Sequence, residues 1–383
     1  MKNTEREKMR ELFKQDLTVV MAITGGGAGA IQSITEMGGA SAILLEATVP
    51  YSKMSSDTYT GVTPVHYCSR EQALNLAVSS YTRGKEQVLD KNCIGLGATA
   101  RLSTNYDGKE RKGRTHEIWV ATHDDSATRT FHCEFKHERT RQFEEQMCSE
   151  IIEEALFDAA RIDYTRNILR SEDEPLIKMV QGSLGYGPVY LKNEAIVQRS
   201  LGMCPIRHED HIVFPGSFNP IHEGHIAMAE AVYKKTHKTI FFEICVRNSD
   251  KPLVDYMRLR ERIEKIESVL SNNPMYAGYI VSNNTLFLDK ARATGFKNYM
   301  LGMDTFNRLL ENKYDALYNK DVDKYTLIKK EDLFKQEGMH FWITERIETR
   351  QNYLITQPEL FTLLHHDEYT DTGISSTHVR NKQ

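Results

Sequence analysis

Two stretches of this chain share one order of elements: an apolar run, a glycine-containing turn, and a segment with helical character. The first covers residues 17–37 and the second residues 212–237. A strand that turns directly into a helix is the unit of parallel sheets, because parallel neighbours need a crossover between them. Two such starts in a chain of 383 residues predict two α/β domains.

The first alternation predicts an α/β sandwich over residues 1–163. An exposed helix at residues 3–15 comes first, and the strands at His116–Thr122 and Thr130–Phe135 are expected to pair in antiparallel fashion. The other strands are predicted at Leu17–Ile23, Ala42–Val49 and Cys93–Ala98, and the helices at Ala28–Met37, Arg70–Arg83 and Arg139–Arg161.

Residues 164–209 are punctuated by glycine and proline and are predicted to be a connector with one helix at Leu191–Arg199. The second alternation then predicts a domain over residues 210–383 with a mostly parallel, doubly wound, Rossmann-like sheet. Its strands are predicted at Ile212–Phe214, Ile240–Val246, Asn298–Leu301, Met339–Thr344 and Leu360–Leu364, and its helices at His222–His237, Asp255–Leu270 and Thr305–Leu310. Ligands of such sheets bind at the carboxyl ends of the strands.

Composition restricts the partners of the chain. A net charge of −4 and a pI near 6.4 provide no basic field for nucleic acid, so any nucleotide is expected to bind in a local pocket. No segment has the apolar length that a membrane helix needs. The six cysteines are scattered, and the charged N-terminus lacks the apolar core of a signal peptide. We expect a cytoplasmic protein, with the nucleus as the alternative compartment.

The turn that opens the second domain reads PGSFNPIHEGH after the strand that ends at Phe214. Gly216 permits the backbone to approach a phosphate closely. His222 and His225 are three residues apart at the start of a helix, so their rings face the same way. A helix N-terminus attracts anions through its N–H groups and its dipole. The turn therefore predicts a phosphate site with paired imidazoles.

A second phosphate-binding pattern, ISSTHVR, covers residues 374–380 near the C-terminus. Ser375, Ser376 and Thr377 supply hydroxyl and backbone donors at a predicted helix start, and Arg380 follows one turn later. A guanidinium can bind two phosphate oxygens at once.

Together, GSFNPIHEGH and ISSTHVR resemble the motifs of the HxGH nucleotidyltransferases, and most of all those of the nicotinamide or nicotinate mononucleotide adenylyltransferases. The resemblance implies that His222, His225 and Arg380 are catalytic and stabilise the transferring phosphates. It implies a set of nucleotide-binding residues: Gly216, Ser217, Phe218, Lys251, Gly302, Asp304, Ser375, Ser376 and Thr377.

The implied reaction needs positioning and charge neutralisation rather than a general base, because the attacking acceptor phosphate is already anionic. The expected partners are ATP and a mononucleotide acceptor, and the expected cofactor is Mg²⁺ on the triphosphate, with no protein side chain assigned as a metal ligand. The tryptophan segment that binds pyridine in eukaryotic relatives is absent, and SNNTLFLDKA stands there at residues 282–291. Its Thr285 and Phe287 are candidates for lining an acceptor pocket.

Several of these residues have plainer interpretations. Asp304 can equally cap the helix that follows it, and Lys251 can be a solvated lysine. His365 and His366 have no neighbours in sequence that would complete a metal site. Residues 52–56, SKMSS, are similar to the KMSKS loop of class I tRNA synthetases, but they precede the histidine motif instead of following it, so that assignment is rejected.

The N-terminal domain resembles the C-terminal domain of CinA, the nicotinamide mononucleotide deamidase family, through ITGG at residues 23–26 and GGASAILLEATVPYS at residues 38–52. Its glycine turn predicts a phosphate nest at Thr24, Gly25 and Gly26, although a plain tight turn is the alternative. The serine of the family's E-S-C-T-G-G motif is here Ala22, and its lysine falls on Ser56. An alanine cannot act as a nucleophile, so deamidation is expected to be lost. The resemblance also implies a homo-oligomer formed through this domain.

Three functions remain open from the sequence. The first is adenylyl transfer to nicotinamide or nicotinate mononucleotide. The second is nucleotidyl transfer to another phosphate-bearing acceptor, or with CTP as the donor. The third is a nucleotide-binding regulatory protein.

Overall fold

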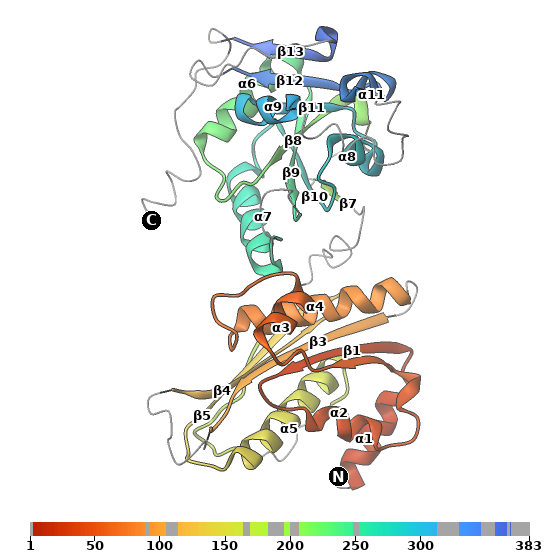
Figure 1. Cartoon of the computed structure of the whole chain (residues 1–383), viewed down its shortest axis with the longest axis vertical. Coiled ribbons are helices and arrows are strands. Elements are labelled where there is room, and N and C mark those ends of the chain that lie inside the picture. The colour runs from red at the N-terminus through yellow and green to blue at the C-terminus, as the bar shows by residue number, and fades with distance from the viewer. Residues whose placement is uncertain are drawn as a thin grey trace. The chain divides into compact units, whose positions relative to one another are not determined.

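The computed structural model describes residues 3–88, 92–104, 114–163, 169–182, 195–199, 207–247, 253–311, 329–345, 357–365 and 368. The chain divides into two compact units (Figure 1). The first extends to residue 191 and includes residues 255–257, and the second takes the rest. Both units are α/β, as the alternation of elements predicts.

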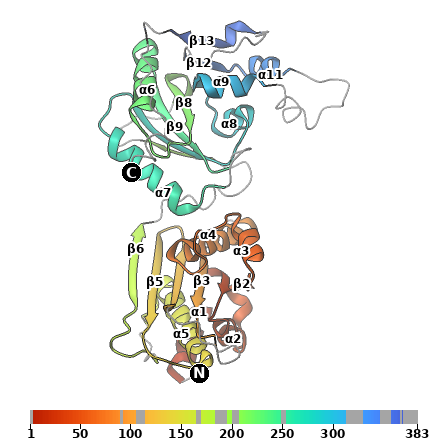
Figure 2. The same ribbon diagram turned by 60° about the vertical axis from the view of Figure 1, so that its left-hand side comes forward.

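The described strands of the first unit form one mixed sheet in the order β2-β1-β3-β4-β5-β6. β1 runs parallel to β2 and β3, whereas β3 to β6 pair in antiparallel fashion, with β6 at one edge (Figure 2). Every residue of β1 is buried, in keeping with its apolar and β-branched sequence. The strands are β1 Leu17–Thr24, β2 Leu44–Thr48, β3 Asn92–Arg101, β4 His116–His123, β5 Ala127–Phe135 and β6 Ile177–Gly182.

Helices cover both faces of this sheet (Figure 1). The helices are α1 Asn3–Phe13, α2 Gly29–Thr35, α3 Lys53–Thr60, α4 Arg70–Gln87 and α5 Arg141–Ala159. The main core joins α1, α2 and α5 to the face of β1 that carries Val19, Met21 and Ile23. α4 packs on the opposite face, where a Cβ on Gly97 would lie 2.6 Å from Leu76 Cβ. Glycine in β3 therefore lets α4 approach the sheet closely.

Two short stretches of the first unit have plain structural roles. Gly95 and Gly97 lie inside β3 under α4. The SKMSS stretch begins α3, with the Ser52 hydroxyl accepting from Ser55 N–H at 3.1 Å as the helix N-cap. It is a capped helix start.

The second unit has a sheet in the order β13-β12-β11-β8-β9-β10-β7 within its described residues. All neighbours are parallel except β7 and β10, which are antiparallel. The strands are β7 Ala195–Arg199, β8 His211–Gly216, β9 Thr239–Cys245, β10 Tyr276–Ser282, β11 Asn298–Gly302, β12 His340–Thr344 and β13 Phe361–Leu364. The predicted doubly wound, mostly parallel sheet is confirmed.

The helices of this unit are α6 Glu223–Thr236, α7 Tyr256–Leu270, α8 Phe287–Thr294, α9 Met303–Leu310 and α11 Lys330–Gln336. Aromatic residues dominate the core on one face, where Phe287 of α8 packs edge-on against Tyr299 and Phe341. β8 is the first of the parallel strands in sequence, with β9 on one side of it and β11 on the other. The direction of winding thus reverses between β8 and β11, which is where doubly wound sheets open a ligand crevice.

The helix predicted at Leu191–Arg199 is wrong over its described part. Ala195–Arg199 is strand β7, paired with β10 from Ala195↔Ser282 to Arg199↔Gly278. Its sequence, AIVQR, is short and contains two β-branched residues, so its pairing partner decides its conformation. The stretch predicted as a connector contributes β6 to one sheet and β7 to the other. No helix in the described part of the chain combines the length and apolarity needed to cross a membrane.

Candidate active site and a second cavity

The paired histidines lie at the start of α6. His222 is the N-cap residue, with extended backbone, and His225 is the third residue of the helix. Their ring centroids are 3.7 Å apart with planes tilted by 31°. The amide N–H of His222 donates to Nδ1 of His225 at 3.3 Å. Because that nitrogen accepts, the proton of a neutral His225 is on Nε2, which can donate to a bound oxygen.

Two aromatic side chains pack against the ring of His225. The ring of Phe218 lies edge-on to His225 with centroids 5.0 Å apart, and Phe214 is 6.0 Å from it. Phe218 is fully buried and has a positive φ of 42°. Its side chain therefore belongs to the core, and only its backbone can meet a nucleotide, contrary to the simplest interpretation of its predicted role.

The structure gives a reason for glycine at position 216 that is not evident from the sequence. A Cβ at this position would lie 2.7 Å from Cε1 of Phe218, closer than real Cβ contacts. The Phe218 ring thus fills the space on the Cβ side of Gly216, and the predicted phosphate contact of the Gly216 backbone stays a prediction. The next residue, Ser217, is exposed, and its carbonyl accepts from Arg262 Nη1 of α7 at 3.1 Å. Arg262 was not predicted, and nothing in its local sequence distinguishes it.

Gly302 and Asp304 lie on the neighbouring strand–helix junction. Gly302 ends β11, which is hydrogen-bonded beside β8, and is the N-cap of α9. A Cβ there would lie 3.2 Å from the Met228 methyl of α6, so Gly302 lies against the histidine-bearing helix. Asp304 is exposed in the first turn of α9, two residues after the N-cap. The structure therefore brings this segment and the histidine turn to the same edge of the sheet.

Other predicted residues of this site fall outside the described part of the chain: Lys251, Ser375, Ser376, Thr377 and Arg380. Their roles stay predictions. Of the acceptor candidates, Thr285 is exposed, but Phe287 is buried in the core between β11 and β12 and cannot line a pocket. His365 Nδ1 lies 2.9 Å from Glu345 Oε2, while His366 is not described. Within the described residues, no three His, Cys, Asp or Glu side chains converge as a metal site.

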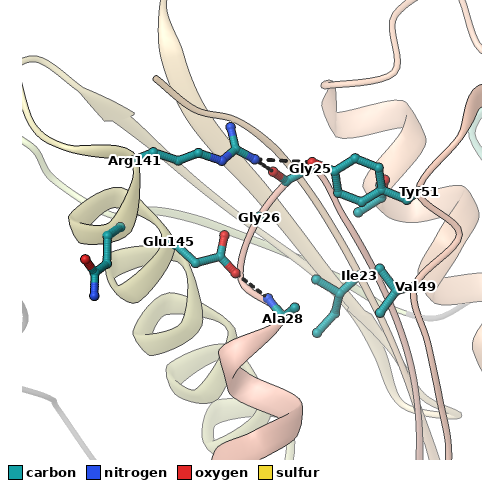
Figure 3. Close-up of a pocket in the computed structure, with 10 residues that line it drawn as sticks. Ile23, Gly25, Gly26, Ala28, Val49, Tyr51, Arg141 and Glu145 are labelled. Atoms are coloured by element: carbon teal, nitrogen blue, oxygen red, sulfur yellow. Dashed lines mark hydrogen bonds between the residues drawn. The ribbon is translucent and has the colours of Figure 1, made fainter. Parts of the chain in front are cut away.

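The first unit contains a cavity of about 520 Å³ at the glycine turn (Figure 3). Its lining includes the predicted Thr24, Gly25 and Gly26, which the structure brings together with Tyr51, Arg141 and Glu145. Gly25 is required by geometry, because its φ is +81° and a Cβ would lie 2.9 Å from the Ala100 carbonyl carbon. Arg141 and Glu145 are one turn apart on α5 and were not predicted as site residues.

The charged side chains in this cavity distinguish it from a simple phosphate nest of backbone N–H groups. Glu145 Oε1 accepts from the N–H of Ala28 at 2.8 Å, so a carboxylate of the protein already occupies part of the turn. Arg141 donates to the Gly25 carbonyl at 3.3 Å and to the Tyr51 hydroxyl at 3.2 Å. These acceptors are neutral, so the exposed guanidinium of Arg141 is a ready contact for an anionic ligand group.

The position of the family's serine lies on the other face of the sheet. Ala22 is fully buried and alternates with Met21 and Ile23, which face α5, so it points toward α4. Ser56, at the position of the family's lysine, is also buried, and its hydroxyl accepts from Gln72 Nε2 at 2.8 Å. Neither position therefore presents an exposed nucleophile, since Ala22 has none and Ser56 is buried and hydrogen-bonded.

One part of the chain matches a known protein family. Residues 213–382 match the cytidylyltransferase-like family. Over 66 residues the chain is 36% identical to a probable nicotinate-nucleotide adenylyltransferase of Lachnoclostridium phytofermentans, which covers 17% of this chain. The chain spans only 33% of the length of that curated relative. The C-terminal unit therefore contains a cytidylyltransferase-like domain, as the two motifs predict.

Solved structures overlap parts of the chain with low TM-scores. The competence/damage-inducible protein CihA from Agrobacterium tumefaciens is 18% identical, with 41% of this chain and 92% of that chain covered and a TM-score of 0.30. The Plasmodium falciparum nicotinic acid mononucleotide adenylyltransferase complexed with NaAD is 15% identical, with 45% and 82% covered and a TM-score of 0.29. Neither overlap identifies a function for this chain.

Proposed function

We propose that the C-terminal domain transfers the adenylyl group of ATP to nicotinamide or nicotinate mononucleotide, releasing pyrophosphate. The observation that carries the proposal is the close pair of imidazoles, His222 and His225, at the start of α6, at the point where the sheet reverses its winding. The name of the curated relative, a probable nicotinate-nucleotide adenylyltransferase, supports the choice of acceptor.

In the proposed reaction, a phosphate oxygen of the mononucleotide attacks the α-phosphorus of ATP. The new P–O bond forms as the bond to the β-phosphate breaks, and pyrophosphate leaves with that electron pair. Nε2–H of His225 and the amides of the first turn of α6 donate to phosphate oxygens as negative charge builds up. ATP is taken as its magnesium complex, so the metal enters with the substrate.

The test is direct assay of the purified chain. Magnesium ATP with either mononucleotide should yield dinucleotide and an equal amount of pyrophosphate. His222→Ala and His225→Ala should each lower the turnover at least about 100-fold without altering the circular dichroism spectrum. His237→Asn, at the exposed end of the same helix, is the matched control. Full activity in both alanine variants would contradict the site.

Two other nucleotidyl transfers remain alternatives to be measured in the same assay. The cytidylyltransferase-like match makes CTP a donor worth testing beside ATP. Pyrophosphate release that needs CTP, or an acceptor other than the pyridine mononucleotides, would select that alternative. If no donor and acceptor pair gives transfer, the remaining alternative is a nucleotide-binding regulatory protein.

A second function is favoured by the cavity at Arg141 and Glu145. We propose that the first unit binds a mononucleotide there without deamidating it, since Ala22 and Ser56 replace the groups that deamidation would use. The purified chain should release no ammonia from nicotinamide mononucleotide, and ammonia release would overturn this part of the proposal.

Self-association through the same unit is also proposed, and light scattering that reports a monomer would refute it.

A further inference from the structure

The segment at residues 282–291, which replaces the pyridine-binding tryptophan segment, contains a buried lysine. Lys290 of α8 is 4% exposed, and its Nζ lies 2.6 Å from Oε1 of Glu243, which is 1% exposed on β9. The Ser282 hydroxyl donates to the same carboxylate oxygen. Burial acts to lower the pKa of Lys290, but Glu243 and, to a smaller extent, Cys245 outweigh it, so the pKa of Lys290 lies above its usual range.

The turn between β10 and α8 is also tied to the end of β9. The Cys245 sulfur lies 3.1 Å from the Asn284 carbonyl oxygen, and the amide of Val246 donates to the Ser282 carbonyl at 2.8 Å. Cys245 is two residues after Glu243, so both side chains are on the same face of β9. The lysine, the serine and the Val246 amide therefore hold residues 283–286 from both ends.

Attaching a helix through a buried ion pair is energetically less favourable than apolar packing. Two charges lose their hydration, whereas apolar side chains of similar volume would pack α8 at lower cost. The second oxygen of Glu243 is buried and has no hydrogen-bond partner among the residues the structure describes. What a directional pair adds is one defined position of the turn, because its bonds fail if the turn shifts.

The turn lies at the carboxyl ends of the parallel strands, the edge that carries the histidine turn after β8. Asn283 and Asn284 are buried, and Thr285 is exposed between Asn284 and the buried Leu286. With the triphosphate placed at α6 after β8, the edge formed by β9 and β10 is left for the acceptor. This placement rests on the proposed adenylyl transfer.

We propose that the Glu243–Lys290 ion pair is a positioning element for the acceptor mononucleotide. It holds the turn at residues 283–286 so that exposed Thr285 completes the acceptor subsite. The pair therefore sets the affinity for the acceptor and leaves the binding of magnesium ATP unaffected. Neither residue touches the reacting atoms.

The test compares Glu243→Gln, Lys290→Met and the double variant, with Lys335→Met as the control, because Lys335 forms an exposed pair with Glu359. Each single variant should raise the KM for the mononucleotide about tenfold or more and leave the KM for magnesium ATP within about twofold. The double variant should regain thermal stability, since no unpaired charge is buried, but keep the raised acceptor KM. The control should match the wild type.

Two kinetic outcomes would overturn the positioning role. One is a double variant that recovers acceptor KM together with stability, which is the result for a purely structural pair. The other is an equal rise of both KM values. Amide hydrogen exchange of residues 283–286 provides a readout without catalysis, and it should quicken in all three variants. If the wild type transfers to no acceptor, the proposed function fails, and unchanged exchange in the variants would separately refute the positioning of the turn.

Discussion

The ring of Phe218 lies over Gly216, in the space that any larger residue at position 216 would need, and the same ring supports His225. In the turn between β8 and α6, the phenylalanine therefore points into the core, and the two histidines are half-buried. A sequence of small and polar residues around one aromatic side chain thus builds a rigid base for the two imidazoles.

Gly216→Ala should disturb this base. The added methyl would overlap the Phe218 ring, and overpacking of this kind costs about 1–3 kcal/mol. We expect a lower melting temperature and a loss of nucleotidyl transfer, because His225 shifts with the ring. Gly302→Ala is the comparison for stability, since its methyl would meet only the flexible end of Met228. Adding Phe218→Leu to Gly216→Ala should recover part of the stability, and no recovery would argue against this packing.

Arg141→Ala should weaken binding in the cavity of the first unit. The guanidinium bonds to neutral acceptors of the protein and is exposed, so a ligand phosphate would be its charged partner. Titration calorimetry with nicotinamide mononucleotide, on chain carrying His222→Ala, should show the affinity falling about tenfold. Arg10→Ala, an exposed arginine on α1, is the control. Equal affinity in both variants would remove Arg141 from the site.

Glu174 should make the first unit sensitive to acid. The Glu174 side chain is buried; burial alone would raise its pKa, but two bonds from Arg139 and two backbone N–H groups lower it from 4.5 to about 2. Because the folded pKa is below the unfolded one, the stabilisation is present above about pH 4.5 and is lost as the pH falls toward 2. It amounts to at most about 3 kcal/mol.

The measurement for Glu174 is urea unfolding at a series of pH values. The wild type should lose stability between pH 4.5 and 2, and Glu174→Gln should lose less over that range, starting from a less stable state at neutral pH. A variant with the same pH dependence as the wild type would show that other carboxylates are responsible.

The buried cysteines should resist alkylation. Burial raises the pKa of Cys93 to about 12 and that of Cys133 to about 11, and it raises the pKa of Cys148 well above its usual value. Thiolate is the reactive form, so iodoacetamide at pH 8 should label these three only after unfolding, whereas the partly exposed Cys245 should react in the folded chain. Peptide mass spectrometry reads out the order, and early labelling of Cys148 would contradict its burial.

Strong local sequence patterns were sufficient to predict much of the fold. β1, the pair β4 and β5, and the long helix α5 follow from apolar runs and helical periodicity, and their limits agree within a few residues. β10 and α8 were not predicted. β10 is buried along its whole length, so its sequence, YAGYIVS, shows no alternation of apolar and polar residues.

The features of the candidate site also divide into those that the sequence predicts and those that only the structure shows. The sequence by itself determined which residues stand at the phosphate turn, because the histidines, the glycine and the helix start are contiguous and their spacing sets which side chains share a face. Only the tertiary structure decided that Phe218 and Phe287 are core residues, that Glu145 meets the amide of Ala28, and that Glu243 pairs with Lys290. Those relationships join residues from separate elements, and burial and charge pairing between distant segments leave no periodic trace in the chain.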